Sequence, residues 1–273
     1  MNYTNEFTSY LKAKRMAEKT IKDYTTDVEK MHEVVNKFDN EITYLDLMNW
    51  VGTISHLSSA TVQRRIVSIR RYFSVLKNLG LIENNPAEAL ESVKVHNKQK
   101  VVLTESEMRS MIDNAKNIRD KAIISLLSHS AIRVSELIGL KVVDAMSDMV
   151  VIRGKGDKER LVYIDDETRS YINEYLEVRH DGCDNLFVSN QGTPMNEKAI
   201  NFTLKNTGKR AGIQNYERIT PHLFRASKAT ALDEAGVSMS VIKEVLGHSN
   251  IQTTSIYIKT SPARVREAMS MAI

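Results

Sequence analysis

Hydrophobic positions in about the first 90 residues recur at intervals of three and four, the spacing of one face of an α-helix. One series predicts a helix and consists of Ile21, Tyr24, Val28, Met31 and Val35. A longer series predicts a second helix over 60–78 and consists of Val62, Ile66, Ile69, Phe73 and Leu76. Apolar residues over 45–51 indicate a shorter helix between them. This part of the chain is therefore predicted to be almost entirely helical.

The pattern changes after Asn85-Pro86, because proline disfavours the helical conformation of the residue before it. A short helix-like segment follows, and then Lys94–Lys100 is polar, basic and without apolar periodicity. We therefore predict a helical domain over residues 1–93, a linker over 94–101 and a second domain over 102–273.

The second domain has a mixed pattern. Thr104 and Glu107 have the spacing of a capping box and predict a helix start. Helices are predicted over 105–115, 119–130, 134–139, 166–179, 196–210, 222–235 and 238–246, with a last one after Ser261-Pro262. Two β-rich runs over 149–153 and 160–164, joined by a turn with glycines, predict a hairpin. The expected fold is mainly α with a small β-sheet.

Composition excludes a disordered chain, since 42% of the 273 residues are hydrophobic and 26% charged. The net charge of +4 is weak evidence for a nucleic-acid partner. Its distribution is more informative, because the helix over 60–78 carries five cations and no Asp or Glu occurs between residues 56 and 82. These cations are Arg64, Arg65, Arg70, Arg71 and Lys77. They form either a phosphate-facing surface or a solvated basic face.

Cys183 is the single cysteine, which excludes an internal disulfide framework and a multi-cysteine zinc module. The N-terminus has no apolar run typical of a secretory signal, and no stretch approaches the roughly 20 apolar residues that cross a bilayer. We expect a soluble cytoplasmic protein.

Several common chemistries have no support in the sequence. Zinc-protease, serine-hydrolase and dinucleotide-binding motifs are missing, and Gly154-Lys155-Gly156 does not fit a phosphate-binding P-loop because Asp157 follows it. We expect neither a metal nor a cofactor. Arg133, Lys155, His222, Arg225, His248 and Tyr257 are weak signals when each is taken alone.

Their order along the chain changes this interpretation. The motifs are Ser130-Ala-Ile-Arg-Val-Ser-Glu-Leu137, Ile152-Arg-Gly-Lys-Gly-Asp-Lys-Glu-Arg-Leu161, Pro221-His-Leu-Phe-Arg225, Leu246-Gly-His-Ser-Asn250 and Thr253-Thr-Ser-Ile-Tyr257. Together they resemble the tyrosine recombinase (phage integrase) family, in its compact, Xer-like two-domain form. The resemblance implies a helical core-binding (SAM-like) DNA-binding domain before an α+β catalytic domain.

The resemblance also assigns roles to residues of the second domain. Tyr257 would be the nucleophile that attacks the scissile DNA phosphate and forms a 3′-phosphotyrosine bond. Lys155 would protonate the leaving 5′-oxygen, His222 would assist proton transfer at the nucleophile, and His248 would hydrogen-bond the phosphate.

Two arginines complete this set. Arg133 and Arg225 match the family arginines that grip the non-bridging phosphate oxygens, and Glu136 matches an acidic residue that orients the cluster. This chain departs from many members by having Ala131-Ile132 before the first arginine, and Phe224 and Ala226 beside the second. Neither departure replaces a catalytic residue.

The resemblance implies as partners double-stranded DNA with an inverted-repeat core site and three further copies of the chain in a homotetramer. Accessory proteins are left open, and no membrane partner is expected. A C-terminal helix with Val265 and Met269 on one face would pack on its own domain or be exchanged with a neighbour. Two other readings remain: a type IB topoisomerase-like enzyme that relaxes DNA, and a non-catalytic DNA-binding protein of the same fold.

Overall fold

The computed structural model describes residues 1–94, 102–147, 149–153 and 159–247. The chain forms two compact units, Met1–Gln99 and Lys100–Ile273. The division falls within the predicted linker, most of which lies outside the described residues. Among the helices of the described ranges, none is both long and apolar enough to cross a membrane. The predicted mainly α fold with a small sheet is confirmed.

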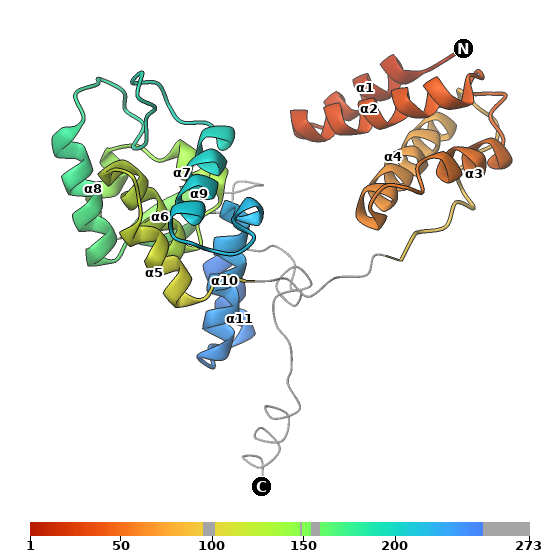
Figure 1. Ribbon diagram of the computed structural model, residues 1–273. Coiled ribbons are helices and arrows are strands. Elements are labelled where there is room, and N and C mark those ends of the chain that lie inside the picture. Colours follow the sequence, from red (N-terminus) through yellow and green to blue (C-terminus); the bar gives the residue numbers. More distant parts are fainter. Residues whose placement is uncertain (95–101, 148, 154–158, 248–273) are drawn as a thin grey trace, which may run out of the picture. The chain divides into compact units, whose positions relative to one another are not determined.

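The first unit is a helical bundle (Figure 1). Its helices are α1 (Thr4–Ala13), α2 (Glu18–Val35), α3 (Tyr44–Thr53) and α4 (Ser59–Asn78). The last three agree with the hydrophobic series in the sequence, which supplies their buried faces. Two polar caps fix helix starts: the Ser58 hydroxyl accepts from the Thr61 amide before α4, and Thr43 forms a capping box with Asp46 before α3.

Two details of the first unit differ from the sequence pattern. The sequence gives α1 no series of its own, because only Phe7 and Leu11 of this helix are buried. The residues after Pro86 form turns, not a short helix. There the Asn85 side chain accepts a hydrogen bond from the Ala87 amide at 2.9 Å, which closes a local turn in place of helical bonding.

A buried carboxylate joins three parts of this bundle. Asp39, 1% exposed, accepts hydrogen bonds from the Tyr3 amide at 2.7 Å and the Tyr72 hydroxyl at 2.6 Å. It also contacts His32 Nε2 at 2.8 Å. Burial, together with the Asp39 carboxylate, raises the pKa of the Tyr72 phenol above its ordinary value. The start of α1 is thereby fixed to α2 and α4.

The second unit is built around α6, whose residues 122–128 are buried on every side. Its helices are α5 (Glu105–Asp113), α6 (Ile118–Ser130), α7 (Val134–Gly139), α8 (Asp166–Val178), α9 (Glu197–Arg210), α10 (Pro221–Glu234) and α11 (Met239–Leu246). Helices α5, α8 and α10 pack against α6, and α11 packs against α10 (Figure 1). These helices agree with the predicted ranges to within two residues.

The predicted hairpin is confirmed as an antiparallel pair, β1 (Met149–Arg153) and β2 (Glu159–Tyr163). Val150 pairs with Val162, and Ile152 pairs with Arg160. The three apolar members of these pairs are at most 6% exposed and face the core, whereas Leu161 is 55% exposed. The hairpin therefore has one buried face, and Arg160 lies on it.

Candidate active site

Arg133 lies at a sharp junction between two helices. Helix α6 ends at Ser130, its C-cap residue Ala131 adopts a left-handed conformation with φ of 52°, and α7 begins after Arg133. Ala131 and Ile132 are almost completely buried, so they fix the junction in the core. The side chain of Arg133 is 34% exposed, which leaves part of its guanidinium accessible from outside.

Glu136 is the centre of the cluster around Arg133. Its Oε1 accepts from Arg133 Nη1 at 2.7 Å, and its Oε2 accepts from the Arg133 backbone amide at 2.8 Å. Oε2 also accepts from Arg160 Nη2 at 2.6 Å. Burial acts to raise the pKa of Glu136, but the hydrogen bonds from Arg133 and the charge of Arg160 outweigh it and hold the pKa below its ordinary value. The carboxylate is therefore ionised at neutral pH.

Arg225 reaches the same cluster from α10. This helix starts with a Thr220 cap and Pro221 in its first turn, and Arg225 is 3% exposed one turn further on. Its Nη1 donates to the Ala131 carbonyl at 2.6 Å, and its Nη2 donates to the Leu246 carbonyl. His222, one turn before Arg225 on the same helix, is exposed.

Three arginines donate hydrogen bonds to the last carbonyls of α11. Arg133 Nη2 donates to the carbonyls of Leu246 and Gly247 at 3.2 and 2.6 Å. Arg160 Nη1 donates to the Val245 carbonyl at 3.2 Å, and Arg225 also donates to Leu246. The C-terminal end of a helix has unsatisfied carbonyls and the negative end of its dipole, so it attracts cations. Helix α11 thereby organises the arginine cluster, which we define as Arg133, Arg160, Arg225 and Glu136.

Three of the seven predicted active-site residues, Arg133, Glu136 and Arg225, are thus brought together. His222 lies on the helix that supplies Arg225. The other three predicted residues, Lys155, His248 and Tyr257, lie outside the described residues. The roles of all seven remain predictions.

Arg160 belongs to this cluster, although the sequence analysis assigned no role to it. The alternation of residues along β2 indicates where Arg160 lies. Arg160, Val162 and Ile164 share the buried side of the strand, and the residues between them are exposed. A cation on the buried face of a strand needs a buried acid as partner, and Glu136 supplies it. The apolar residues at 161 and 163 obscure this alternation in the sequence.

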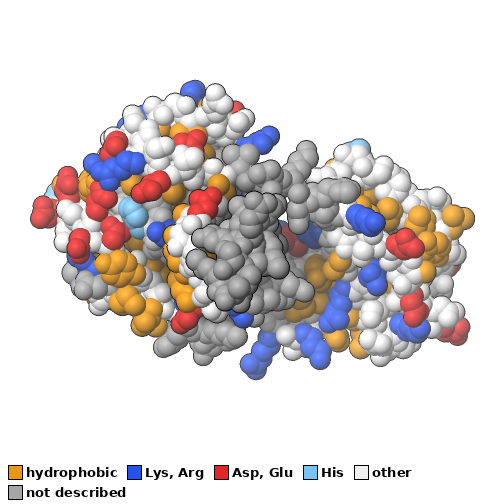
Figure 2. Space-filling view, turned by 90° about the horizontal axis from the view of Figure 1, so that it is seen from below, with side chains coloured by type: hydrophobic (Ala, Val, Ile, Leu, Met, Phe, Trp, Pro, Cys, Tyr) orange, Lys and Arg blue, Asp and Glu red, His pale blue; other side chains and the backbone are white. Residues whose placement is uncertain are grey.

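The five predicted DNA-contact residues lie on α4, and most of them are exposed. Arg64 and Arg71 lie seven positions apart, as do Arg70 and Lys77, so each pair occupies one side of the helix. The side chain of Arg65 is only 15% exposed. Basic side chains of this unit reach the surface in the face drawn in Figure 2.

A buried acid holds two of these residues. Asp27 on α2 is 1% exposed and accepts two hydrogen bonds from Arg64 and one, at 2.7 Å, from the Ser68 hydroxyl. Arg65 Nε lies 3.8 Å from the same carboxylate. The pairing fixes the orientation of Arg64 while its side chain stays 46% exposed. Whether this face of α4 contacts DNA remains a prediction.

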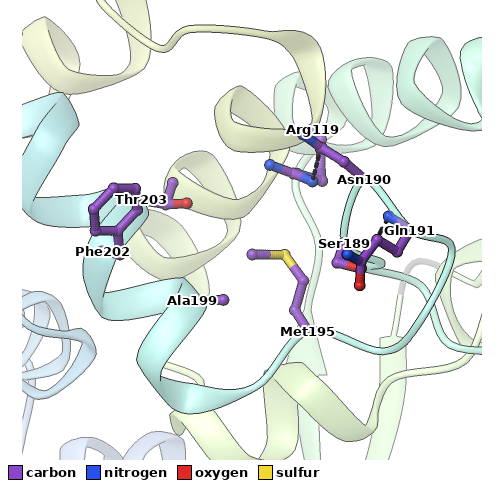
Figure 3. A pocket seen from close by; sticks show the side chains of 8 residues that line it. All are labelled: Arg119, Ser189, Asn190, Gln191, Met195, Ala199, Phe202 and Thr203. Atoms are coloured by element: carbon purple, nitrogen blue, oxygen red, sulfur yellow. Dashed lines mark hydrogen bonds between the residues drawn. The ribbon is translucent and has the colours of Figure 1, made fainter.

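A shallow pocket of about 300 Å³ lies elsewhere in the second unit, between α9 and the 189–195 loop (Figure 3). It is lined by Arg119, Ser189, Asn190, Gln191, Met195, Ala199, Phe202 and Thr203. Its one titratable side chain, Arg119, already donates to Asp120, Asn190 and the Val188 carbonyl. The pocket shares no residue with the arginine cluster, and its lining contains no carboxylate, histidine or cysteine.

Two family models match the chain. The phage integrase family model matches residues 101–264, and the model of the phage integrase N-terminal SAM-like domain matches residues 4–80. The two matches thus cover both units.

Curated relatives match over almost their whole length. Tyrosine recombinase XerA of Pyrococcus horikoshii is 33% identical over 275 residues, covering 98% of this chain and 92% of the relative. Tyrosine recombinase XerC of Leptospira interrogans is 29% identical over 289 residues, covering 98% and 91%.

Solved structures show the same fold. A XerA recombinase crystal structure, 27% identical, has a TM-score of 0.56 and covers 99% of this chain and 97% of that one. XerH recombinase bound to palindromic difH substrate in a post-cleavage complex has a TM-score of 0.78 at 22% identity, covering 96% and 84%. A lambda integrase dimer bound to a COC′ core site has a TM-score of 0.79 at 16% identity, covering 95% and 98%.

Proposed function

The chain belongs to the phage integrase family of tyrosine recombinases, and from this membership we propose that it is a site-specific recombinase that cuts and rejoins double-stranded DNA. The convergence of Arg133 and Arg225 on one helix end supports this most directly, because two forked cations side by side suit a phosphodiester. The relatives are matched over nearly their full length, so the proposal concerns the whole enzyme.

The proposed reaction starts at Tyr257. Its phenolic oxygen loses a proton with the help of His222 and attacks the scissile phosphorus, which forms a tyrosine–phosphorus bond. The bond from phosphorus to the 5′-oxygen breaks, and that oxygen leaves as a hydroxyl after taking a proton from Lys155. The product is a 3′-phosphotyrosine, and no external energy source is needed because the phosphoester bond is conserved. Attack by the 5′-hydroxyl of another strand reverses the step and joins the exchanged strands.

Arg133 and Arg225 would stabilise the negative charge of the phosphate. Arg133 and Arg225 bind the non-bridging oxygens, where negative charge increases in the transition state, and His248 adds a hydrogen bond. Both guanidiniums donate to carbonyls at the end of α11. We expect these carbonyls to orient the two guanidiniums for the phosphate, and the exposed part of Arg133 to contact it.

The two units divide the work. We assign residues 1–93 to DNA binding through the exposed face of α4, and 102–273 to catalysis, with 94–101 as the linker. Arg64, Arg65, Arg70, Arg71 and Lys77 would serve the backbone phosphates, and Asp27 keeps Arg64 in a fixed orientation. Contacts of this kind make binding sensitive to salt.

Assembly is the finer part of the proposal. Four copies would hold two duplexes in the cytoplasm, each protomer acting on one half of an inverted-repeat core site, with or without accessory proteins. The segment after Pro262, with Val265 and Met269 on one face, would dock on a neighbouring protomer and link the four active sites.

A trapping experiment tests the chemistry. The full chain first selects its preferred duplex from a randomised pool, and that duplex is then nicked near the cleavage position so that the short fragment diffuses away. The wild type should form a covalent protein–DNA adduct, which denaturing gels detect, and Tyr257→Phe should form none. Tyr163→Phe, which alters an exposed tyrosine of the same unit, is the matched control. An equally abundant adduct in Tyr257→Phe would refute the nucleophile assignment.

A plasmid assay separates recombination from relaxation. A recombinase exchanges strands between two selected sites on one supercoiled plasmid and gives recombined circles. A topoisomerase-like enzyme relaxes the plasmid but leaves the order of its segments unchanged. A protein that only binds gives neither product.

A further inference from the structure

Arg160 is a largely buried cation, and its acidic partner among the residues that the structure describes is Glu136. Its side chain is 8% exposed and that of Glu136 is 7% exposed, with 2.6 Å between Arg160 Nη2 and Glu136 Oε2. Burial lowers the pKa of Arg160, and Glu136 opposes this by favouring the charged form. The charge of this guanidinium is therefore directed at Glu136, and we assign it no contact with a DNA phosphate.

Arg133 pairs with the same carboxylate, but its side chain is 34% exposed, so part of its guanidinium is accessible from outside. The three side chains carry a net charge of +1, from two guanidiniums and one carboxylate. With Arg160 present, the buried pair is neutral and the charge of Arg133 remains available to a phosphate. Without Arg160, Glu136 would neutralise Arg133 and draw it inward.

The contacts of Arg160 also join two chain segments. Its Nη1 donates to the Val245 carbonyl, so strand β2 is fixed to the end of α11. Gly247 allows this approach: a Cβ at this position would lie 2.4 Å from Arg160 Cδ and 3.0 Å from its Nε. The left-handed φ of +57° at Gly247 favours glycine as well.

We propose that Arg160 is a positioning residue for DNA cleavage: it neutralises Glu136 and connects the β1–β2 hairpin to α11, so that Arg133 keeps both its place and its charge for the scissile phosphate. This inference rests on the proposed cleavage reaction. Arg160 itself touches neither DNA nor the reacting atoms.

The test compares two substrates at saturating protein. One is the selected nicked duplex, and the other has a methylphosphonate at the scissile position, mapped beforehand from the wild-type adduct. A methylphosphonate lacks one negative charge, so it depends less on arginine cations. On the normal duplex, Arg160→Met should form the adduct at least about tenfold more slowly than the wild type. On the methylphosphonate its deficit should be several-fold smaller.

Two further variants control for folding. Arg160→Lys retains the charge and should recover most of the rate on the normal duplex. Arg179→Met removes another largely buried arginine, bound to Asp181 and to backbone carbonyls away from the cluster. It should change the rates on both substrates by the same factor.

Three results would overturn the proposal: an Arg160→Met rate within twofold of the wild type, an equal deficit on both substrates, or no recovery in Arg160→Lys. If Arg160→Met does not fold, Arg160→Gln replaces it in both comparisons, because glutamine removes the charge but keeps a polar group for Glu136 and the Val245 carbonyl. Absence of any adduct with the wild type would instead refute the cleavage reaction itself.

Discussion

Asp27 in the first unit and Glu136 in the second unit each hold two arginine side chains. In both pairs one arginine is well exposed and the other is mostly buried: Arg64 at 46% against Arg65 at 15%, and Arg133 at 34% against Arg160 at 8%. The surroundings differ. The arginines of Asp27 are neighbours on α4, whereas those of Glu136 come from the start of α7 and from β2.

The second difference is the helix end. Arg133 and Arg160 also donate to the final carbonyls of α11, so Glu136 lies at the meeting point of three elements. Within the described part of the chain, the contacts of Asp27 join α2 and α4. A carboxylate paired with two arginines therefore joins two helices at Asp27, whereas at Glu136 the same arrangement holds the arginine cluster together. We therefore expect changes at Glu136 to lower the rate of DNA cleavage, and changes at Asp27 to lower stability with little effect on that rate.

The largest expected effect comes from Glu136→Ala. Both arginines lose their common acceptor, so Arg133 is no longer oriented, and adduct formation on the selected duplex should fall on the order of 100-fold. The measurement is the single-turnover rate at saturating protein. Glu136→Gln keeps the shape but not the charge and should fall in between. A rate within twofold of the wild type in Glu136→Ala would contradict the central place of this carboxylate.

The same residue gives a pH dependence. Its pKa in the folded state lies below the ordinary glutamate value. A depressed pKa means that the stabilisation is present above the unfolded-state value and is lost as the pH falls through the folded-state value. Thermal unfolding of the wild type should therefore lose stability in the acid range more steeply than that of Glu136→Gln. If stability fell with pH equally in the two proteins, ionisation of Glu136 would contribute nothing to the stability of the fold.

Asp27→Asn should affect stability and leave the chemistry intact. The change weakens the bonds of α2 to Arg64 and Ser68, and we expect a loss of about 2 kcal/mol, less than for a fully buried pair because Arg64 can return to water. Chemical denaturation measures this loss. At saturating protein, the adduct rate should stay within about twofold of the wild type. A large fall in that rate would remove the distinction between the two carboxylates.

Gly247→Ala tests the helix end with a smaller change. The added methyl collides with Arg160, and the left-handed backbone costs about 1 kcal/mol for any L-residue. We expect an adduct rate reduced by about tenfold. Gly236→Ala is the matched control, since its φ is +80° but a Cβ there meets nothing within 4 Å. Gly236→Ala should lose the same backbone free energy but keep the adduct rate. Equal adduct rates in the two variants would exclude a steric effect of the Gly247→Ala methyl group on Arg160.

The sequence predicted most of the fold because its signals are local. The capping box of Thr104 and Glu107 predicted a helix start that the structure confirms. Helix α1 gave a weak signal, since only two of its residues face the core. Its position depends instead on the buried Asp39, which binds the Tyr3 amide from a site 36 residues along the chain.

The arginine cluster was predicted in part for the same reason. Arg133 and Glu136 lie one turn apart within a motif, so the sequence brings them together. Arg160 and Asp27 find their partners 24 and 37 residues away, and only packing determines those distances. A sequence can indicate such a pair when a basic residue falls on the buried side of a strand, as Arg160 does on β2.

The smallest expected effect concerns Ala131, the C-cap residue of α6. Its left-handed φ of 52° strains an alanine by about 1–2 kcal/mol, while its buried methyl contributes roughly 0.8 kcal/mol, and glycine would add entropy to the unfolded chain. Ala131→Gly should therefore change the free energy of unfolding by less than about 1 kcal/mol and keep the adduct rate, because the carbonyl that accepts from Arg225 remains. Ala131→Val, with a branched side chain in the same conformation, should be clearly less stable in the same denaturation assay. If valine were tolerated as well as glycine, the junction before Arg133 would not be held in this conformation.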